Sequence, residues 1–178
     1  MTKTTKNIVG IVITVLIIIV MLMYSSYGKN RYFNKVVLSS ENRVFNITTQ
    51  NYMDTVILVG LSELRIKGVD VLIKPLVPLP KGPDDLEINA FIRKYGRAKY
   101  VIEIGSFSKS EVIGILSHEL MHLHQYHTSR LHMTTTSLIW YDRVYITDIP
   151  HYFDRPWEIE AEGLGRILEK KIRNQLYN

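Results

Sequence analysis

An uncharged run of 22 residues, from position 7 to position 28, limits most strongly what this chain of 178 residues can form. Its centre is a nearly unbroken series of Ile, Val, Leu and Met. A helix of about 20 apolar residues spans the hydrocarbon core of a bilayer. Tyr24 and Tyr27 stand near its end, where aromatic rings favour the membrane interface. The run therefore predicts a single-pass transmembrane anchor over residues 1–28.

Two other interpretations of this run stay open, a buried core helix and a cleavable signal peptide. The basic start suits a signal peptide, but the apolar run is long and residues 26–28 match a small-residue cleavage site poorly. Two lysines precede the run and three basic residues follow it closely, so the positive-inside rule is nearly balanced. The basic start and the absence of cysteine favour a domain outside the cytoplasm.

The basic residues are distributed unevenly along the chain. It has 22 Lys and Arg against 17 Asp and Glu, but four of the basic residues lie in the first 31 positions, where there is no acid. The remaining 18 basic and 17 acidic residues make the rest almost neutral, which predicts no nucleic-acid partner. The chain has no cysteine, which excludes disulfides and thiolate metal ligands.

After the anchor, residues 29–53 are predicted to be a juxtamembrane segment and residues 54–178 one α+β domain. Short segments of alternating and helical hydrophobic pattern, separated by turn residues, indicate its elements. We expect a helix over 54–67, a strand over 69–74, a stiff loop at the prolines of 75–83, a hairpin of 88–95 with 99–104, a helix over 108–127, a strand pair of 137–141 with 144–147, and a last helix from 156.

The segment that points to chemistry is His-Glu-Leu-Met-His at positions 118–122. Ser108 and Glu111 form a capping box that starts its helix. His118 and His122 are four residues apart and lie about 40° apart around the helix axis, so both imidazoles can reach one ion. Glu119 can lean over a metal-bound water without binding the metal. The pattern predicts a zinc site with Glu119 as general base.

A hydrolytic zinc site has three protein ligands and one open position. The extended pattern that would place a third histidine at position 128 fails, because Gln125 and Thr128 stand where it needs Gly and His. The better source of the third ligand is the last helix, which begins Pro-Trp-Glu-Ile-Glu-Ala-Glu at positions 156–162.

These two motifs, HELMHLHQ and PWEIEAE, resemble the small gluzincin-type zinc peptidase domains of bacterial and phage sequences. The resemblance implies a zincin-like fold, a small antiparallel sheet with an active-site helix and a C-terminal helix. It also implies Zn²⁺ held by His118, His122 and Glu160, with the small Ala161 allowing close helix packing. Glu158 is the next candidate for the third ligand, and Glu162 follows it.

Together these features predict a membrane-anchored zinc metallopeptidase that acts on a peptide or protein. We expect residues 99–104 to hold an extended substrate by strand addition. Gln125 shares the ligand face and is either a residue that supports a ligand or a surface glutamine. Tyr145, His151 and Tyr152 are candidates to cover the site.

The alternative function is a non-catalytic, membrane-tethered structural or binding protein whose zinc only stabilises the fold. Such a closed site would have four protein ligands, and His151 is the candidate for the fourth.

Overall fold

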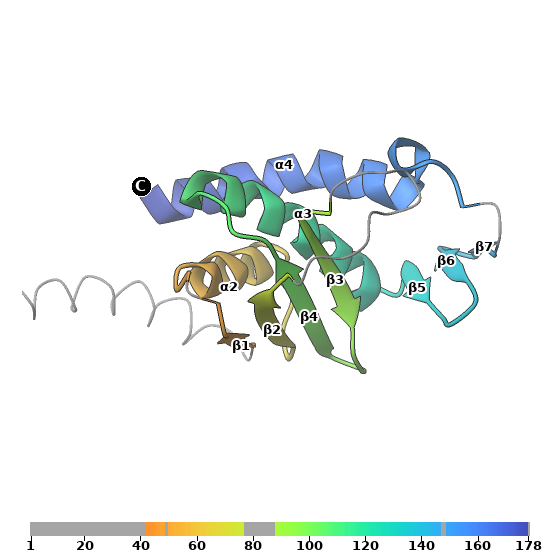
Figure 1. The fold of residues 1–178 in the computed structure, drawn as a ribbon, viewed down its shortest axis with the longest axis horizontal. Coiled ribbons are helices and arrows are strands. Elements are labelled where there is room, and N and C mark those ends of the chain that lie inside the picture. The colour runs from red at the N-terminus through yellow and green to blue at the C-terminus, as the bar shows by residue number, and fades with distance from the viewer. Residues whose placement is uncertain (1–41, 49, 77–87, 147–148, 178) are drawn as a thin grey trace, which may run out of the picture. The chain divides into compact units, whose positions relative to one another are not determined.

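The computed structural model describes residues 42–48, 50–76, 88–146 and 149–177. These residues form an α+β fold with a four-stranded mixed sheet, three α-helices and a smaller three-stranded sheet (Figure 1). None of the helices in these ranges is long and apolar enough to cross a membrane. The predicted anchor at 1–28 and most of the proline-containing loop lie outside the described residues.

The main sheet has the strand order β1-β2-β4-β3. Its strands are β1 (Arg43–Asn46), β2 (Asp70–Pro75), β3 (Ala90–Lys94) and β4 (Lys99–Ile104). The expected antiparallel sheet is wrong for two of the three pairings, because β1 and β4 both run parallel to β2. Helix α2 (Met53–Glu63) connects β1 to β2, and parallel neighbours require such a crossover.

Strand β1 also changes the predicted domain boundary. Residues 29–53 are expected to be a juxtamembrane segment, but Arg43–Asn46 pairs with β2 along its whole length. The folded domain therefore begins before residue 54. A four-residue strand in a polar stretch gives too little alternation to be separated from a linker by pattern alone.

The hairpin around Gly96 and Arg97 is confirmed, since β3 and β4 pair antiparallel on either side of it. The expectation that residues 99–104 form a free edge is wrong. Strand β4 is hydrogen-bonded to β2 on one side and to β3 on the other, so its backbone groups are occupied. Among the described residues, the edge strand on this side of the sheet is β3.

Helix α3 (Lys109–His127) begins at the predicted capping box, in which the Ser108 side chain accepts from Glu111 N–H and the Glu111 carboxylate accepts from Ser108 N–H. Helix α4 (Pro156–Tyr177) begins at the predicted proline. The two helices pack along each other in opposite directions (Figure 1), because Gln125 near the end of α3 contacts Trp157 while Arg173 near the end of α4 contacts Ser110.

Small residues allow these two helices to approach closely. Ala161 is fully buried, as expected from the sequence, and Gly165 lies one turn further along α4. A Cβ atom built on Gly165 would lie 3.3 Å from the Cα atom of His118. The backbone of the helix that carries the HExxH motif is therefore positioned directly by Gly165.

Replacing Gly165 with Val is expected to lower the free energy of unfolding by about 1–3 kcal/mol, because the added side chain meets the α3 backbone rather than a movable side-chain end. Urea unfolding would measure the change. Gly163→Val is the matched control, since nothing lies within 4 Å of a Cβ at that exposed position. Equal losses for the two variants would contradict the close contact at Gly165.

A second sheet follows α3 and consists of β5 (Leu131–Met133), β6 (Leu138–Trp140) and β7 (Arg143–Tyr145). The predicted strand pair on either side of Asp142 is confirmed, whereas β5 is an addition. The buried face of this sheet packs on the start of α4, where the rings of Tyr145 and Trp157 lie 5.3 Å apart. Tyr145 is thus a packing residue.

Candidate metal centre

Three side chains from the two helices meet between α3 and α4. They are His118, His122 and Glu158, and the ligand atoms that they offer lie within 4.8 Å of one another. The His122 Nε2 atom is 3.1 Å from His118 Nε2 and 3.1 Å from the Glu158 Oε2 atom. The His118 Nε2 atom is 3.2 Å from the same oxygen. This group could hold a metal ion.

The triangle of donor atoms fits zinc in size and chemistry. Zinc in proteins binds imidazole nitrogen and carboxylate oxygen at about 2.0–2.2 Å, so neighbouring ligands of a tetrahedral ion stand roughly 3.3 Å apart. The three measured separations of 3.1–3.2 Å are close to that value. In the described part of the chain no fourth His, Asp or Glu joins the group, which matches a site with one open position.

Glu160, the expected third ligand, points elsewhere. Its carboxylate forms an ion pair with Arg130 and accepts a hydrogen bond from the Gln125 amide at 2.9 Å. The structure therefore brings Glu158 to the histidines in place of Glu160. The reason is the helical repeat, because residues two positions apart on α4 point to nearly opposite sides of the axis.

Glu162, the remaining candidate, also lies outside the triangle of donor atoms. Its Oε2 atom is 3.6 Å from the Nδ1 atom of His118, the nitrogen that faces away from the other two ligands. Its carboxylate is ion-paired with Arg166. Glu162 is thus placed to orient the ring of His118 rather than to bind the ion.

Gln125 is a supporting residue and not a surface glutamine. It is completely buried, and its Oε1 atom accepts a hydrogen bond from His122 Nδ1 at 2.9 Å. Its amide nitrogen donates to the Trp157 carbonyl and to Glu160, each at 2.9 Å. Gln125 thereby fixes the ring of His122 with Nε2 directed at Glu158, and it joins that ring to the start of α4.

Glu119 is buried beside the three ligands with one carboxylate oxygen, Oε2, that has no hydrogen-bond partner. The backbone of Ile92 on strand β3 lies beside this carboxylate. Burial raises the pKa of Glu119, and the repulsive charge of Glu158 acts in the same direction. A buried carboxylate that is only partly satisfied is costly, and it marks the place where a ligand or a water would be bound.

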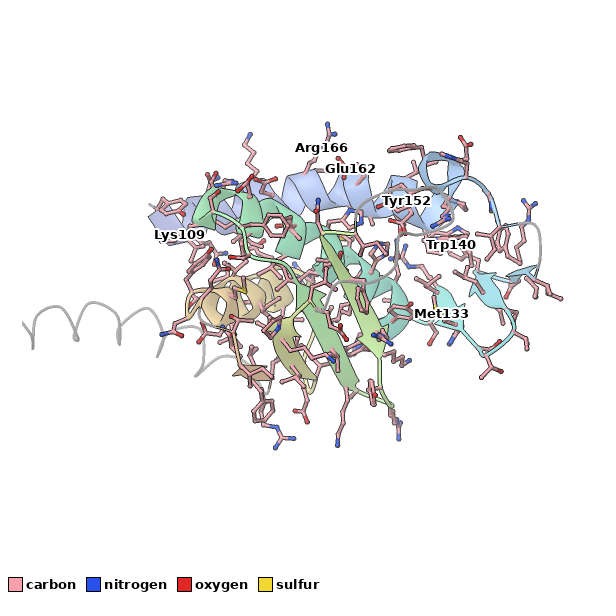
Figure 2. All side chains as sticks on the ribbon, viewed as in Figure 1. Lys109, Met133, Trp140, Tyr152, Glu162 and Arg166 are labelled. Atoms are coloured by element: carbon pink, nitrogen blue, oxygen red, sulfur yellow. The ribbon has the colours of Figure 1, made fainter. Side chains whose placement is uncertain are left out.

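Two residues of the segment before α4 were candidates to cover the site. Tyr152 lies in the short helix η1 (Tyr152–Asp154), close to Glu158. Burial raises the pKa of Tyr152, and the charge of Glu158 adds to this effect. His151 is exposed and stacks on Phe153, with ring centroids 6.1 Å apart, and it is not part of the metal-binding group. Figure 2 labels Tyr152 beside the start of α4.

The charges of the site are strongly coupled. Burial opposes ionisation of Glu158, but hydrogen bonds from His118 and His122 outweigh it and hold the pKa of Glu158 well below its usual range. Burial likewise opposes protonation of His122, yet its hydrogen bond to Glu158 and the negative charge of Glu119 raise the pKa of His122 to about 9. In the metal-free protein at neutral pH, His122 is therefore protonated and carries a positive charge within the site.

Zinc binding at pH 7 is expected to release this proton, because a metal-binding imidazole must be neutral. The raised pKa of His122 stabilises the metal-free fold below about pH 6.5, and this contribution is lost as the pH rises through about 9. Zinc affinity should accordingly rise from pH 6.5 to 9, by up to about tenfold per pH unit. Calorimetry in buffers of different ionisation enthalpy would count the proton, and a pH-independent affinity would contradict this assignment.

Comparison of the chain with models of protein families, with curated proteins and with solved structures gives no match. The assignment of the site consequently depends on its own geometry and chemistry.

Proposed function

We propose that this chain is a single-pass membrane-anchored zinc peptidase with a zincin-like catalytic domain. The observation that carries the proposal is Glu119, a buried carboxylate with a free oxygen, placed beside three residues able to bind one ion. A site that only stabilised the fold would need a fourth ligand and would have no use for Glu119. The membrane anchor is the uncharged run at residues 7–28 of the sequence.

In the proposed reaction His118, His122 and Glu158 hold the ion. Zinc bound in such a site supplies Lewis acidity, which polarises a peptide carbonyl and acidifies a water. Glu119 accepts the proton of the attacking water and donates it to the leaving amine. Its raised pKa suits both steps, because a general base of higher pKa holds the proton more firmly until the amine takes it. Gln125 keeps His122 in place through the reaction.

In this proposal the substrate pairs with strand β3 and not with β4. Strand β3 is an edge strand of the main sheet within the described ranges, and its Ile92 backbone lies beside Glu119. An extended peptide that pairs with this edge would pass close to the general base. Extended peptides or unfolded segments of proteins are therefore the proposed substrate class.

Removal of the metal is the direct test of this function. The full-length protein purified in detergent is expected to contain one zinc ion per chain and to cleave a pool of unstructured peptides. A chelator should abolish cleavage, and added zinc should restore it. Mass spectrometry of products and elemental analysis would measure both. A protein without stoichiometric zinc, or cleavage unaffected by chelation, would refute the proposal.

A further inference from the structure

We propose that one end of the main sheet, the end at which β1, β2 and β4 begin, docks on the surface of an anionic lipid bilayer. The inference rests on the membrane anchor proposed above and is independent of the peptidase activity. We call this surface the basic edge. It consists of Arg43, Arg65, Lys67, Lys94, Arg97 and Lys99.

Topology gathers these residues from three separate segments. Strands β1, β2 and β4 are parallel, so their first residues lie side by side at the same end of the sheet. Arg43 is beside Asp70, and Asp70 is beside Lys99. The loop that carries Arg65 and Lys67 leads into β2 at this edge. The turn that carries Arg97 joins β3 to β4 there as well (Figure 1). The linear sequence shows the three cations of residues 94–99 but not that the other two segments join them.

Among the described residues the basic edge has a single acid, Asp70, whose carboxylate binds the Arg43 guanidinium with N–O distances of 2.6 and 2.7 Å. The nearby Glu63 is directed to α4, where it pairs with Lys171 and Gln175. Elsewhere the described residues carry ten basic and eleven acidic side chains. The described residues therefore carry their excess of positive charge at this end of the sheet.

Some of these cations have partners within the domain, since Arg43 binds Asp70 and the Lys94 ammonium donates to the Tyr126 carbonyl at 3.4 Å. Three others are available to an external partner. Within the described ranges no carboxylate pairs with Arg65, Lys67 or Arg97, and all three are exposed. The strand ends border an open hollow that extends from Gly68 to the hairpin turn. Tyr95 stands beside it with 75% of its surface exposed. Clustered basic residues with an exposed tyrosine are suited to a layer of lipid headgroups.

The path of the chain identifies a bilayer as the partner. Asn42, the residue before β1, is buried, and its side chain bonds the Ile66 carbonyl at 2.7 Å and Val69 N–H at 3.1 Å. The chain is therefore fixed at the basic edge where it enters the domain. Only 14 residues, 29–42, separate this point from the uncharged run, and 14 residues span at most about 50 Å.

A tether this short keeps the edge at a high effective concentration near the membrane, so a weak electrostatic attraction is sufficient for docking. Each basic side chain close to an anionic surface strengthens binding by roughly fivefold. Docking by this edge would fix the orientation of the domain relative to the bilayer.

The test uses the full chain in lipid vesicles and exploits its lack of cysteine. A fluorescent label is attached at Gly96→Cys, where nothing lies within 4 Å of a Cβ, or at the exposed Thr135→Cys in the turn between β5 and β6 as the control. A headgroup-labelled quencher lipid reports approach. We expect quenching at position 96 in vesicles with about a third of anionic lipid, its loss in 0.5 M salt, and little quenching at 135.

Charge variants give the matched comparison. Neutralising Lys67, Arg97 and Lys99 together with Gln is expected to weaken docking by about 100-fold, whereas the same change at Lys109, Lys170 and Lys171 should leave it intact. Equal quenching on neutral and anionic vesicles, or equal loss in both triple variants, would overturn the proposal. So would a complex with duplex DNA at physiological salt that needs the same three residues while vesicles give no quenching.

A separate measurement tests the membrane anchor. A chain that does not float with neutral vesicles lacks the anchor, but its basic edge should still bind anionic vesicles at low salt. Zinc content and peptide cleavage report the peptidase, and neither depends on the charge of the lipid.

Discussion

Replacement of Glu119 by Gln is expected to lower kcat/KM for peptide hydrolysis by about 10²–10⁴-fold while zinc stays bound. The amide keeps the size and shape of the side chain, but it cannot take up a proton. The three metal-binding residues remain unchanged. Kinetics on a quenched fluorescent peptide and the zinc content of the same sample would measure the two quantities.

The Glu119 variant should fold at least as well as the original protein. Burial raises the pKa of Glu119, so its ionised form destabilises the fold at a pH above that pKa, and a neutral Gln relieves this cost. Glu169→Gln is the control, because that carboxylate pairs with Arg173 away from the metal-binding group. Full activity of the Glu119 variant with zinc bound would remove its role as general base.

Helix α3, which carries the HExxH motif, is the most predictable part of this molecule because its signals are local. A capping box at Ser108, an apolar stripe and the HExxH spacing all lie within 20 consecutive residues, and the structure has the helix at the predicted place. The start of α4 at Pro156 depends on equally local signals. The sheet order depends on pairings between distant segments, which no local pattern encodes. For that reason β1 was missed and the edge strand was misassigned.

The choice between Glu158 and Glu160 as the third ligand is one that the sequence pattern of α4 can indicate. The buried residues of α4 repeat every three or four positions, at Trp157, Ala161, Gly165, Leu168 and Ile172. On a helical projection centred on Ala161, Glu158 lies about 60° to one side and Glu160 about 100° to the other. Phasing of this stripe would have favoured Glu158, the carboxylate nearer to the buried face. The resemblance instead favoured the Glu that directly precedes Ala.

Glu160 has a different role in the structure. It links Arg130, at the start of β5, to Gln125 and through it to His122. A carboxylate in this position stabilises the amide orientation in which Gln125 Oε1 faces the His122 ring. Glu158 and Glu160 are therefore both expected to affect metal binding, one as a direct ligand and the other through two intervening side chains.

This difference predicts unequal effects for two chemically identical substitutions. Glu160→Gln, which removes a supporting charge, is expected to weaken zinc binding by about 10–100-fold. Glu158→Gln should weaken it by more than 100-fold, because an uncharged amide replaces one of three ligands. It should also lower the pKa of His122 from about 9, since the hydrogen bond that His122 donates to Glu158 raises that value.

Competition with a zinc chelator of known affinity would measure both losses, and an NMR titration of the metal-free protein would follow His122. Both substitutions remove one negative charge from α4, so each serves as the matched control for the other. A larger loss of zinc in Glu160→Gln, with the pKa of His122 unchanged in Glu158→Gln, would return the third ligand to Glu160. The observed 3.1 Å contact between Glu158 and His122 favours the opposite result, because a carboxylate already held at ligand distance from both imidazoles needs no rearrangement to bind the ion.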